Sequence, residues 1–117
     1  MGNRNSIIQA VAERVRMEFN YKKISKGKLS ALYFTYNPEV QGDMFVLEAE
    51  KIFPKLNCGL TSVYLRNILG GKVIQGKYDK YRHTFLMVGK QVIDITADQY
   101  GGPEVYVGKL KSPWTLI

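Results

Sequence analysis

The spacing of apolar residues changes from a helical to a strand-like period at Gly70-Gly71, and this change limits the chain to folds with separate helical and sheet parts. Before these glycines, apolar residues recur every three or four positions, as on one face of an amphipathic helix. After them, short apolar runs are separated by turn residues, which is typical of strands. Helices followed by antiparallel strands predict an α+β fold.

The length of 117 residues fits a single domain over residues 1–117, large enough to bury a core without disulfides. One cysteine cannot form an internal disulfide, and one Cys with one His falls short of a structural zinc site. We therefore expect no metal and no cofactor. No apolar run reaches the length of a membrane span, and no apolar leader segment is present, so we expect a cytoplasmic location, or delivery from the cytoplasm without a standard signal peptide.

Three helices are expected in the first half of the chain. The first covers residues 4–19, where apolar side chains recur at helical spacing. The second covers residues 44–53, with Asp43 at its cap and a proline directly after it. The third begins at Cys58 and ends at the glycine pair, because glycine readily adopts the left-handed conformation of a helix C-terminus.

The segment between the first two helices is less regular. Residues 20–30 are polar, rich in lysine and contain a glycine, so they are predicted to form a loop. Residues 29–36 are apolar and aromatic, and they fit either a short strand or a turn of helix, since a short apolar run does not distinguish the two.

Four strands are predicted after Gly71, at residues 72–78, 84–88, 91–96 and 104–110. Gly89 and Lys90 separate the second from the third by two residues, which is the length of a tight hairpin turn. These strands are expected to form an antiparallel sheet on which the helices pack.

Cys58 is the only cysteine of the chain and stands at the expected start of the third helix. A thiol attacks as its thiolate, and a helix N-terminus or a neighbouring imidazolium lowers the pKa of the thiol. The free N–H groups of the first helical turn can also stabilise an oxyanion. These features favour a nucleophile; the alternative is a small buried hydrophobic residue, which is a frequent role of free cysteine.

His83 is the only histidine, and it lies across the predicted Gly89-Lys90 turn from Asp94. If the strands pair symmetrically about that turn, Asp94 pairs near Phe85, two residues from His83. A carboxylate in an apolar stretch needs a partner when buried, and orienting a catalytic imidazole provides one. The alternatives are a core or surface histidine and an acid that caps a turn.

Two segments resemble the transglutaminase-like and papain-like cysteine enzymes. Residues 58–65 are similar to the nucleophile helix of those enzymes. Residues 83–100 are similar to their hairpin, which reads His-x-Trp, a turn, and then an aspartate in a stretch like Asp-Ile-Thr. Phe85 stands where the family often has Trp. The resemblance covers residues 55–110, about half of the chain.

This resemblance implies a small helical subdomain with Cys58 packed against an antiparallel sheet. Cys58 would be the nucleophile, His83 the general base and acid, and Asp94 the orienting acid. Attack on an amide or thioester carbonyl of a protein or peptide would give a thioacyl enzyme. Water then completes hydrolysis or deamidation, or an amine completes transfer. Compact domains of this type also occur as bacterial effector or toxin modules.

Asn57 and Gln99 are the candidate oxyanion and substrate-binding residues. No glutamine occurs in the ten residues before Cys58, where papain-like enzymes have their oxyanion glutamine, so Asn57 and the backbone N–H of Cys58 are the available donors. Gln99 could line the site. Alternatively it belongs with Asp98 to a structured turn before the glycines at 101–102.

Positive charge and tyrosine supply the remaining signals. The net charge is +7, and basic clusters occur at residues 22–28 and 77–82, which fit an acidic partner or two solvated loops. Tyr78, Tyr81 and Tyr100 could wall a substrate groove or fill core and surface positions. Two alternatives to an enzyme stay open: a non-catalytic protein-binding module on the same scaffold, and a nucleic-acid binder, for which the sequence holds no motif.

Overall fold

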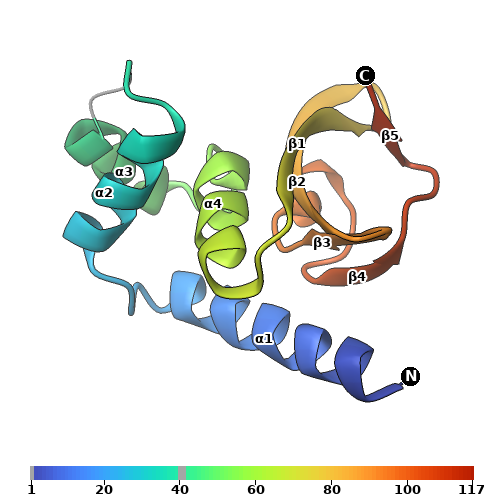
Figure 1. The fold of residues 1–117 in the computed structure, drawn as a ribbon. Helices are drawn as coiled ribbons and strands as arrows, with labels where there is room; N and C mark the ends of the chain where they lie inside the picture. The colour runs from blue at the N-terminus through green and yellow to red at the C-terminus, as the bar shows by residue number, and fades with distance from the viewer. Residues whose placement is uncertain (1, 40–41) are drawn as a thin grey trace.

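A computed structural model describes residues 2–39 and 42–117 of the chain and has an α+β architecture (Figure 1). The helices of the described residues are α1 (Gly2–Asn20), α2 (Lys26–Tyr36), α3 (Gly42–Lys51) and α4 (Cys58–Leu69). The strands of the described residues are β1 (Lys72–Tyr78), β2 (Tyr81–Val88), β3 (Gln91–Asp94), β4 (Tyr106–Lys109) and β5 (Trp114–Leu116), with a short 3-10 helix, η1 (Ala97–Tyr100), between β3 and β4.

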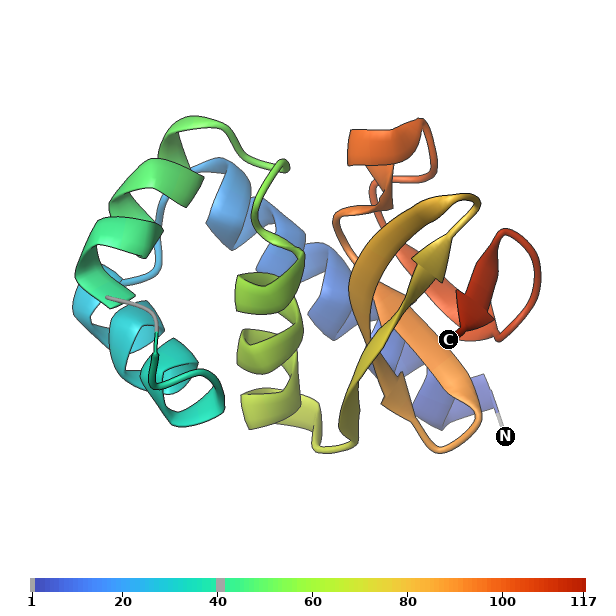
Figure 2. The same cartoon turned by 90° about the horizontal axis from the view of Figure 1, so that it is seen from above.

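Helix α4 lies between the other helices and the sheet. It has α2 and α3 on one side and the curled sheet on the other, while α1 runs along the edge of both layers (Figures 1 and 2). Helix α4 contacts β1, β2 and β3, and α1 contacts β4 and α4. Within the described parts of the chain, no helix combines the length and apolarity needed to cross a membrane.

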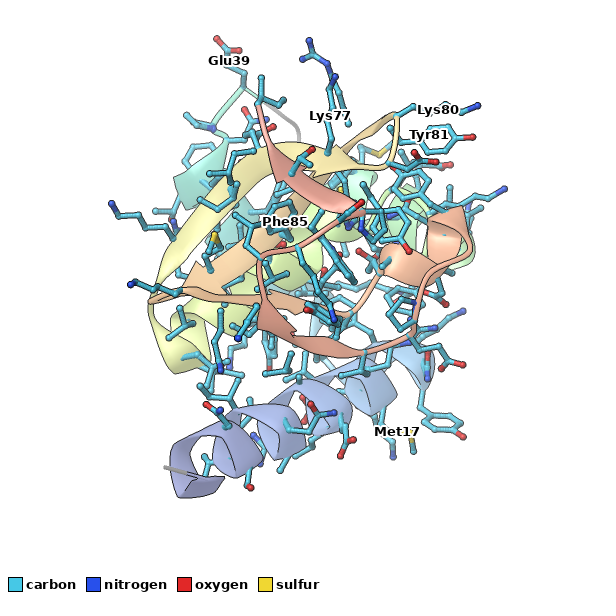
Figure 3. The ribbon with its side chains drawn as sticks, turned by 90° about the vertical axis from the view of Figure 1, so that its right-hand side faces the viewer. Met17, Glu39, Lys77, Lys80, Tyr81 and Phe85 are labelled. Carbon is cyan, nitrogen blue, oxygen red and sulfur yellow. The ribbon has the colours of Figure 1, made fainter. Side chains whose placement is uncertain are left out.

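The curled sheet separates two apolar cores. The outer face contributes Leu86, Ile93 and Ile95 to a core shared with the helices. The inner face encloses a smaller core around Phe85 and Trp114, and Phe85 is fully buried inside the curl (Figure 3). Alternating side chains of one strand therefore serve both cores, as the period of a strand requires.

All strand pairs are antiparallel, and the strand order is β4-β3-β2-β1-β5. Val88 pairs with Gln91, which confirms the predicted two-residue turn at Gly89-Lys90. The first strand has the predicted bounds, whereas β2 begins three residues earlier than predicted, at Tyr81. The added residues pair with the end of β1, so this hairpin is longer than its apolar run indicated.

The loop prediction for residues 20–30 is wrong in its second half, where α2 begins at Lys26. The Ser25 side chain accepts a hydrogen bond from the Lys28 backbone N–H at 3.2 Å and caps the helix. Lysine is a good helix former, so the polar composition does not oppose a helix. Residues 29–36, which fitted a strand or a helix turn, are helical.

The remaining elements match their predicted positions or differ from them by about two residues at their ends. Helix α1 covers the predicted first helix, and α4 has the predicted start and end. Asp43 lies inside the first turn of α3 and is not its cap, and the residue before that helix lies outside the described residues. Strand β5 was not predicted, because its three residues directly after a proline are too short a run for a strand pattern to be recognised.

Gly76 is required where β1 passes between β2 and β5. It pairs with His83 on one side and with Leu116 on the other. A Cβ at this position would lie 2.6 Å from the Thr115 carbonyl oxygen and 2.7 Å from the Phe85 ring. The absence of a side chain therefore lets the inner core close beneath the strand that carries His83.

We predict that Gly76→Ala lowers the free energy of unfolding by about 1–3 kcal/mol, because the added methyl group forces backbone or ring shifts in a packed core. Urea denaturation measures the change. Gly27→Ala is the matched control: its Cβ meets only Ser25 Oγ at 3.6 Å, and alanine is favoured over glycine in a helix. Equal stability of the two variants would contradict the packing argument.

Candidate active site

Cys58 is the first residue of α4 and is partly exposed. The first intrahelical bond of α4 runs from the Thr61 N–H to the Asn57 carbonyl at 2.9 Å. The N–H groups of residues 58–60 therefore precede the hydrogen-bonded part of the helix, as at any helix N-terminus. This arrangement places the sulfur beside a cluster of outward-facing backbone donors.

His83 and Asp94 form a buried pair. His83 Nε2 lies 2.7 Å from Asp94 Oδ2, and both side chains are almost completely shielded from solvent. Trp114 Nε1 donates to the same oxygen at 2.8 Å, and the Thr96 N–H donates to Oδ1 at 2.9 Å. The carboxylate thus has partners on both oxygens, which is the condition for keeping a charge buried.

The strand pairing explains how Asp94 reaches His83. Strands β2 and β3 pair from Val88–Gln91 to Leu86–Ile93, and their ladder ends there. Beyond this point the backbones of the two strands no longer pair, so the side chains of Asp94 and His83 can approach each other in the space between them. The predicted proximity of these two residues is confirmed, with a direct hydrogen bond between the side chains.

The second ring nitrogen of His83, Nδ1, is available to Cys58. It is buried and forms no hydrogen bond of normal geometry with any described residue. Cys58 and His83 are nevertheless close enough for each to shift the pKa of the other. Since Nε2 is held by Asp94, Nδ1 is the nitrogen that can exchange a proton with the thiol.

The contacts of Cys58 and His83 outweigh the effect of their burial. Burial alone would lower the pKa of His83, but the hydrogen bond and charge of Asp94, together with Cys58, raise it to about 9. Burial alone would raise the pKa of Cys58, but the nearby His83 and Thr84 outweigh this effect and lower it. Both shifts favour a thiolate beside an imidazolium.

Asn57 and Gln99, the other predicted site residues, occupy different environments. The Asn57 side chain is buried and donates to the carbonyls of Ala49 at 2.9 Å and Lys55 at 2.7 Å. Its amide hydrogens are therefore used to fix the connector before α4, and it is not an oxyanion donor. Gln99 lies in η1, and its Nε2 is buried without a hydrogen-bond partner among the described residues.

The tyrosines predicted near the site form one aromatic cluster with His83. The Tyr100 ring stands edge-on to His83 at 5.2 Å between centroids and stacks on Tyr81 at 4.7 Å. Tyr78 stacks on the other side of Tyr100 at 6.0 Å and belongs to the inner core. The cluster holds His83 between the core and the exposed Tyr81 ring.

Sequence reasoning did not identify Trp114, Thr84 or Tyr33 as site residues. Trp114 is on the unpredicted strand β5, and the only signal was that it is the sole tryptophan. Tyr33 comes from α2, and a Cβ at Gly59 would lie 3.2 Å from its hydroxyl. Trp114 and Tyr33 reach the site through tertiary contacts between distant segments, which local sequence patterns do not report.

A metal centre has no support in the described part of the chain, where no group of three or more His, Cys, Asp or Glu residues could hold an ion.

The family model described as YunG protein matches residues 51–113, more than half of the chain. The chain belongs to the YunG protein family. The matched segment includes Cys58, His83 and Asp94. No curated protein and no solved structure matches the chain.

We predict that Asp94→Asn shifts the His83 pKa downward from about 9, because the variant loses the charge that stabilises the imidazolium. The Cys58 pKa should rise as a consequence, moving the pH midpoint of iodoacetamide alkylation upward. Proton NMR of the single imidazole and alkylation rates across pH measure the two shifts. Trp114→Phe keeps the carboxylate and is the control, with a smaller expected change. A wild-type His83 pKa near its ordinary value of 6.5 would contradict this account of the pair.

Proposed function

We propose that the chain is a cysteine-dependent acyl-transfer enzyme that acts on an amide of a protein or peptide, on a papain-like or transglutaminase-like fold. The observation that carries the proposal is the bridging position of His83. Its Nε2 is bonded to Asp94 at 2.7 Å, while its buried Nδ1 is left for Cys58. A nucleophile, a base and a group that orients the base are the parts that covalent catalysis requires.

In the first step, the Cys58 thiolate attacks the substrate carbonyl carbon and forms a C–S bond, and the carbonyl oxygen takes up the negative charge. The imidazolium of His83 then donates its Nδ1 proton to the leaving nitrogen. The C–N bond breaks, the amine departs, and a thioester remains on Cys58. Asp94 stays ionised and holds the Nε2–H throughout, so it orients the ring and stabilises its charged form.

In the second step, neutral His83 accepts a proton from water or from an acceptor amine at Nδ1. The resulting nucleophile attacks the thioester carbonyl, the C–S bond breaks, and the thiolate and imidazolium are restored. Water gives a carboxylic acid, as in hydrolysis or deamidation, and an amine gives a new amide. The same residues serve both outcomes, so the acceptor decides the reaction.

Two donors are suited to stabilise the oxyanion. The backbone N–H of Cys58 is in the first turn of α4, before its hydrogen-bonded part. The hydroxyl of Tyr33 borders Gly59, the next residue, at 3.2 Å from the position of an added Cβ. Burial raises the pKa of Tyr33, so its hydroxyl remains protonated and able to donate near neutral pH. Such donors contribute to catalysis when they point to the place where charge develops.

The central test uses p-nitrophenyl acetate as an activated acyl donor. We expect one acetyl group per chain on Cys58, detected by mass spectrometry, with release of p-nitrophenolate and slower loss of the acetyl group to water. Cys58→Ser should abolish the adduct, and His83→Ala should slow acylation by at least about 100-fold. An adduct that forms equally fast without His83 would remove the basis for the proposed mechanism.

The role of Tyr33 is tested by comparing two reactions of the same sulfur. Acylation passes through an oxyanion, whereas alkylation by iodoacetamide does not. Tyr33→Phe is expected to slow acylation by about 100-fold while leaving the alkylation rate near that of the wild type. Tyr36→Phe is the matched control, since its hydroxyl lies on the same helix and bonds to Gln75. Equal losses in both reactions would instead indicate a structural role for Tyr33.

A further inference from the structure

The end of the β1–β2 hairpin carries an excess of positive charge, with three cationic side chains and one acidic side chain at residues 77–82. Lys77 and Arg82 are exposed and lie directly opposite each other across the two strands. Like charges in this arrangement destabilise a sheet. On its other side Lys77 pairs with Thr115, which is uncharged. A costly pair of this kind calls for an explanation outside the stability of the hairpin.

No ion pair within the described ranges, residues 2–39 and 42–117, involves Lys77, Lys80 or Arg82. Asp79, in the turn, is the only acidic residue between positions 72 and 90. We call Lys77, Lys80 and Arg82 the basic tip. Figure 3 shows the side chains of Lys77 and Lys80 projecting outward from this end of the hairpin, with Tyr81 beside Lys80.

The basic tip is attached directly to the candidate active site. The Tyr100 hydroxyl donates to the Arg82 carbonyl at 3.1 Å, and the Tyr100 ring contacts both Tyr81 and His83. Lys80 Nζ lies over the Tyr81 ring at 5.5 Å from its centroid. These contacts through Tyr100 fix the position of the basic tip relative to the His83 imidazole, which would exchange a proton with Cys58.

Arg82 also shares a strand face with Thr84, which is near enough to Cys58 to lower the pKa of its thiol. Residues two apart on a strand face the same side at a spacing of about 6.7 Å. Lys77 is opposite Arg82 on that face. A peptide with its carbonyl at Cys58 would thus have neighbouring side chains within reach of both cations, about one or two residues away.

We propose that the basic tip binds a carboxylate side chain of an acidic peptide substrate, next to the amide that Cys58 attacks. This inference rests on the proposed function and names its substrate class. Arg82 offers a planar fork of donors that matches a carboxylate, and Lys77 adds a second cation.

The first test compares two alkylating reagents that differ mainly in charge, iodoacetate and iodoacetamide. In the double variant Lys77→Gln/Arg82→Gln, the ratio of the iodoacetate rate to the iodoacetamide rate should fall about fourfold at low salt, as expected for two charges about 10 Å from the sulfur. The fall should vanish at high salt. Lys72→Gln/Lys90→Gln changes two exposed lysines at the opposite end of the same hairpins and should keep the wild-type ratio.

The second test uses a hexaglutamate peptide, a hexaglutamine peptide and a single-stranded oligonucleotide as ligands, with binding followed by fluorescence anisotropy. Binding of hexaglutamate alone, weakened at least about tenfold in the Lys77→Gln/Arg82→Gln variant, supports the proposal. Equal binding of both peptides, or binding of the oligonucleotide without hexaglutamate, overturns it. If p-nitrophenyl acetate does not acylate the wild-type protein, the proposed function is refuted instead, so the two failures are distinguishable.

Discussion

The buried carboxylate of Asp94 is the constraint on which the rest of the site depends. A charge held away from water is stable only when donors surround it. Asp94 receives them from His83 on β2, from Trp114 on β5 and from Thr96 in the segment after β3. Trp114 is twenty positions from Asp94 in the sequence and lies on β5, which pairs with β1, so the sheet must curl to bring β5 back toward Asp94 on β3. The curl of the sheet and the orientation of the imidazole are therefore one structural requirement.

The same curl explains why the thiol and the imidazole approach from different sides. Helix α4 packs on the outer face through the core that contains Leu86 and Ile93, which brings its first residue to the end of the β2–β3 ladder. His83 shares the inner face with Phe85, on which the smaller core is built. The β2–β3 ladder ends at Leu86 and Ile93, and beyond this end Cys58 and His83 come close enough to shift each other's pKa.

Local signals in the sequence were sufficient for the elements that carry the nucleophile and the base. The break before Cys58 and the glycines after Leu69 bound α4, and the two-residue turn at Gly89-Lys90 sets the register of β2 and β3. That register alone predicts Asp94 close to His83. The helical segment from Lys26 was missed because its polar composition fits both a loop and an exposed helix, and only the Ser25 cap distinguishes them.

The residues that sequence reasoning missed or misassigned have roles set by contacts between distant segments. Trp114 belongs to a strand of only three residues, and its role follows from the position of Asp94, which is fixed by other strands. Asn57 was expected at an oxyanion position because it precedes the nucleophile, but its amide is taken by the Ala49 and Lys55 carbonyls. A neighbour in sequence thus stabilises the backbone, while Tyr33, from another helix, borders the nucleophile. Hydrogen-bond competition of this kind is decided by tertiary structure.

Helix α1 takes part in the construction of the site through Arg16. Arg16 is buried, and it donates to the Ile95 carbonyl at 2.8 Å and to both oxygens of Asp98 at 2.8 and 2.9 Å. These bonds hold Ile95 and Asp98, on either side of Thr96, which donates to Asp94. Asp98 is also two residues before Tyr100, which contacts His83. Because a bidentate arginine pair is directional as well as strong, α1 fixes the orientation of this segment and not merely its proximity. The geometry of the triad therefore depends on a contact made 82 positions earlier in the chain, and the helical half is part of the site's construction.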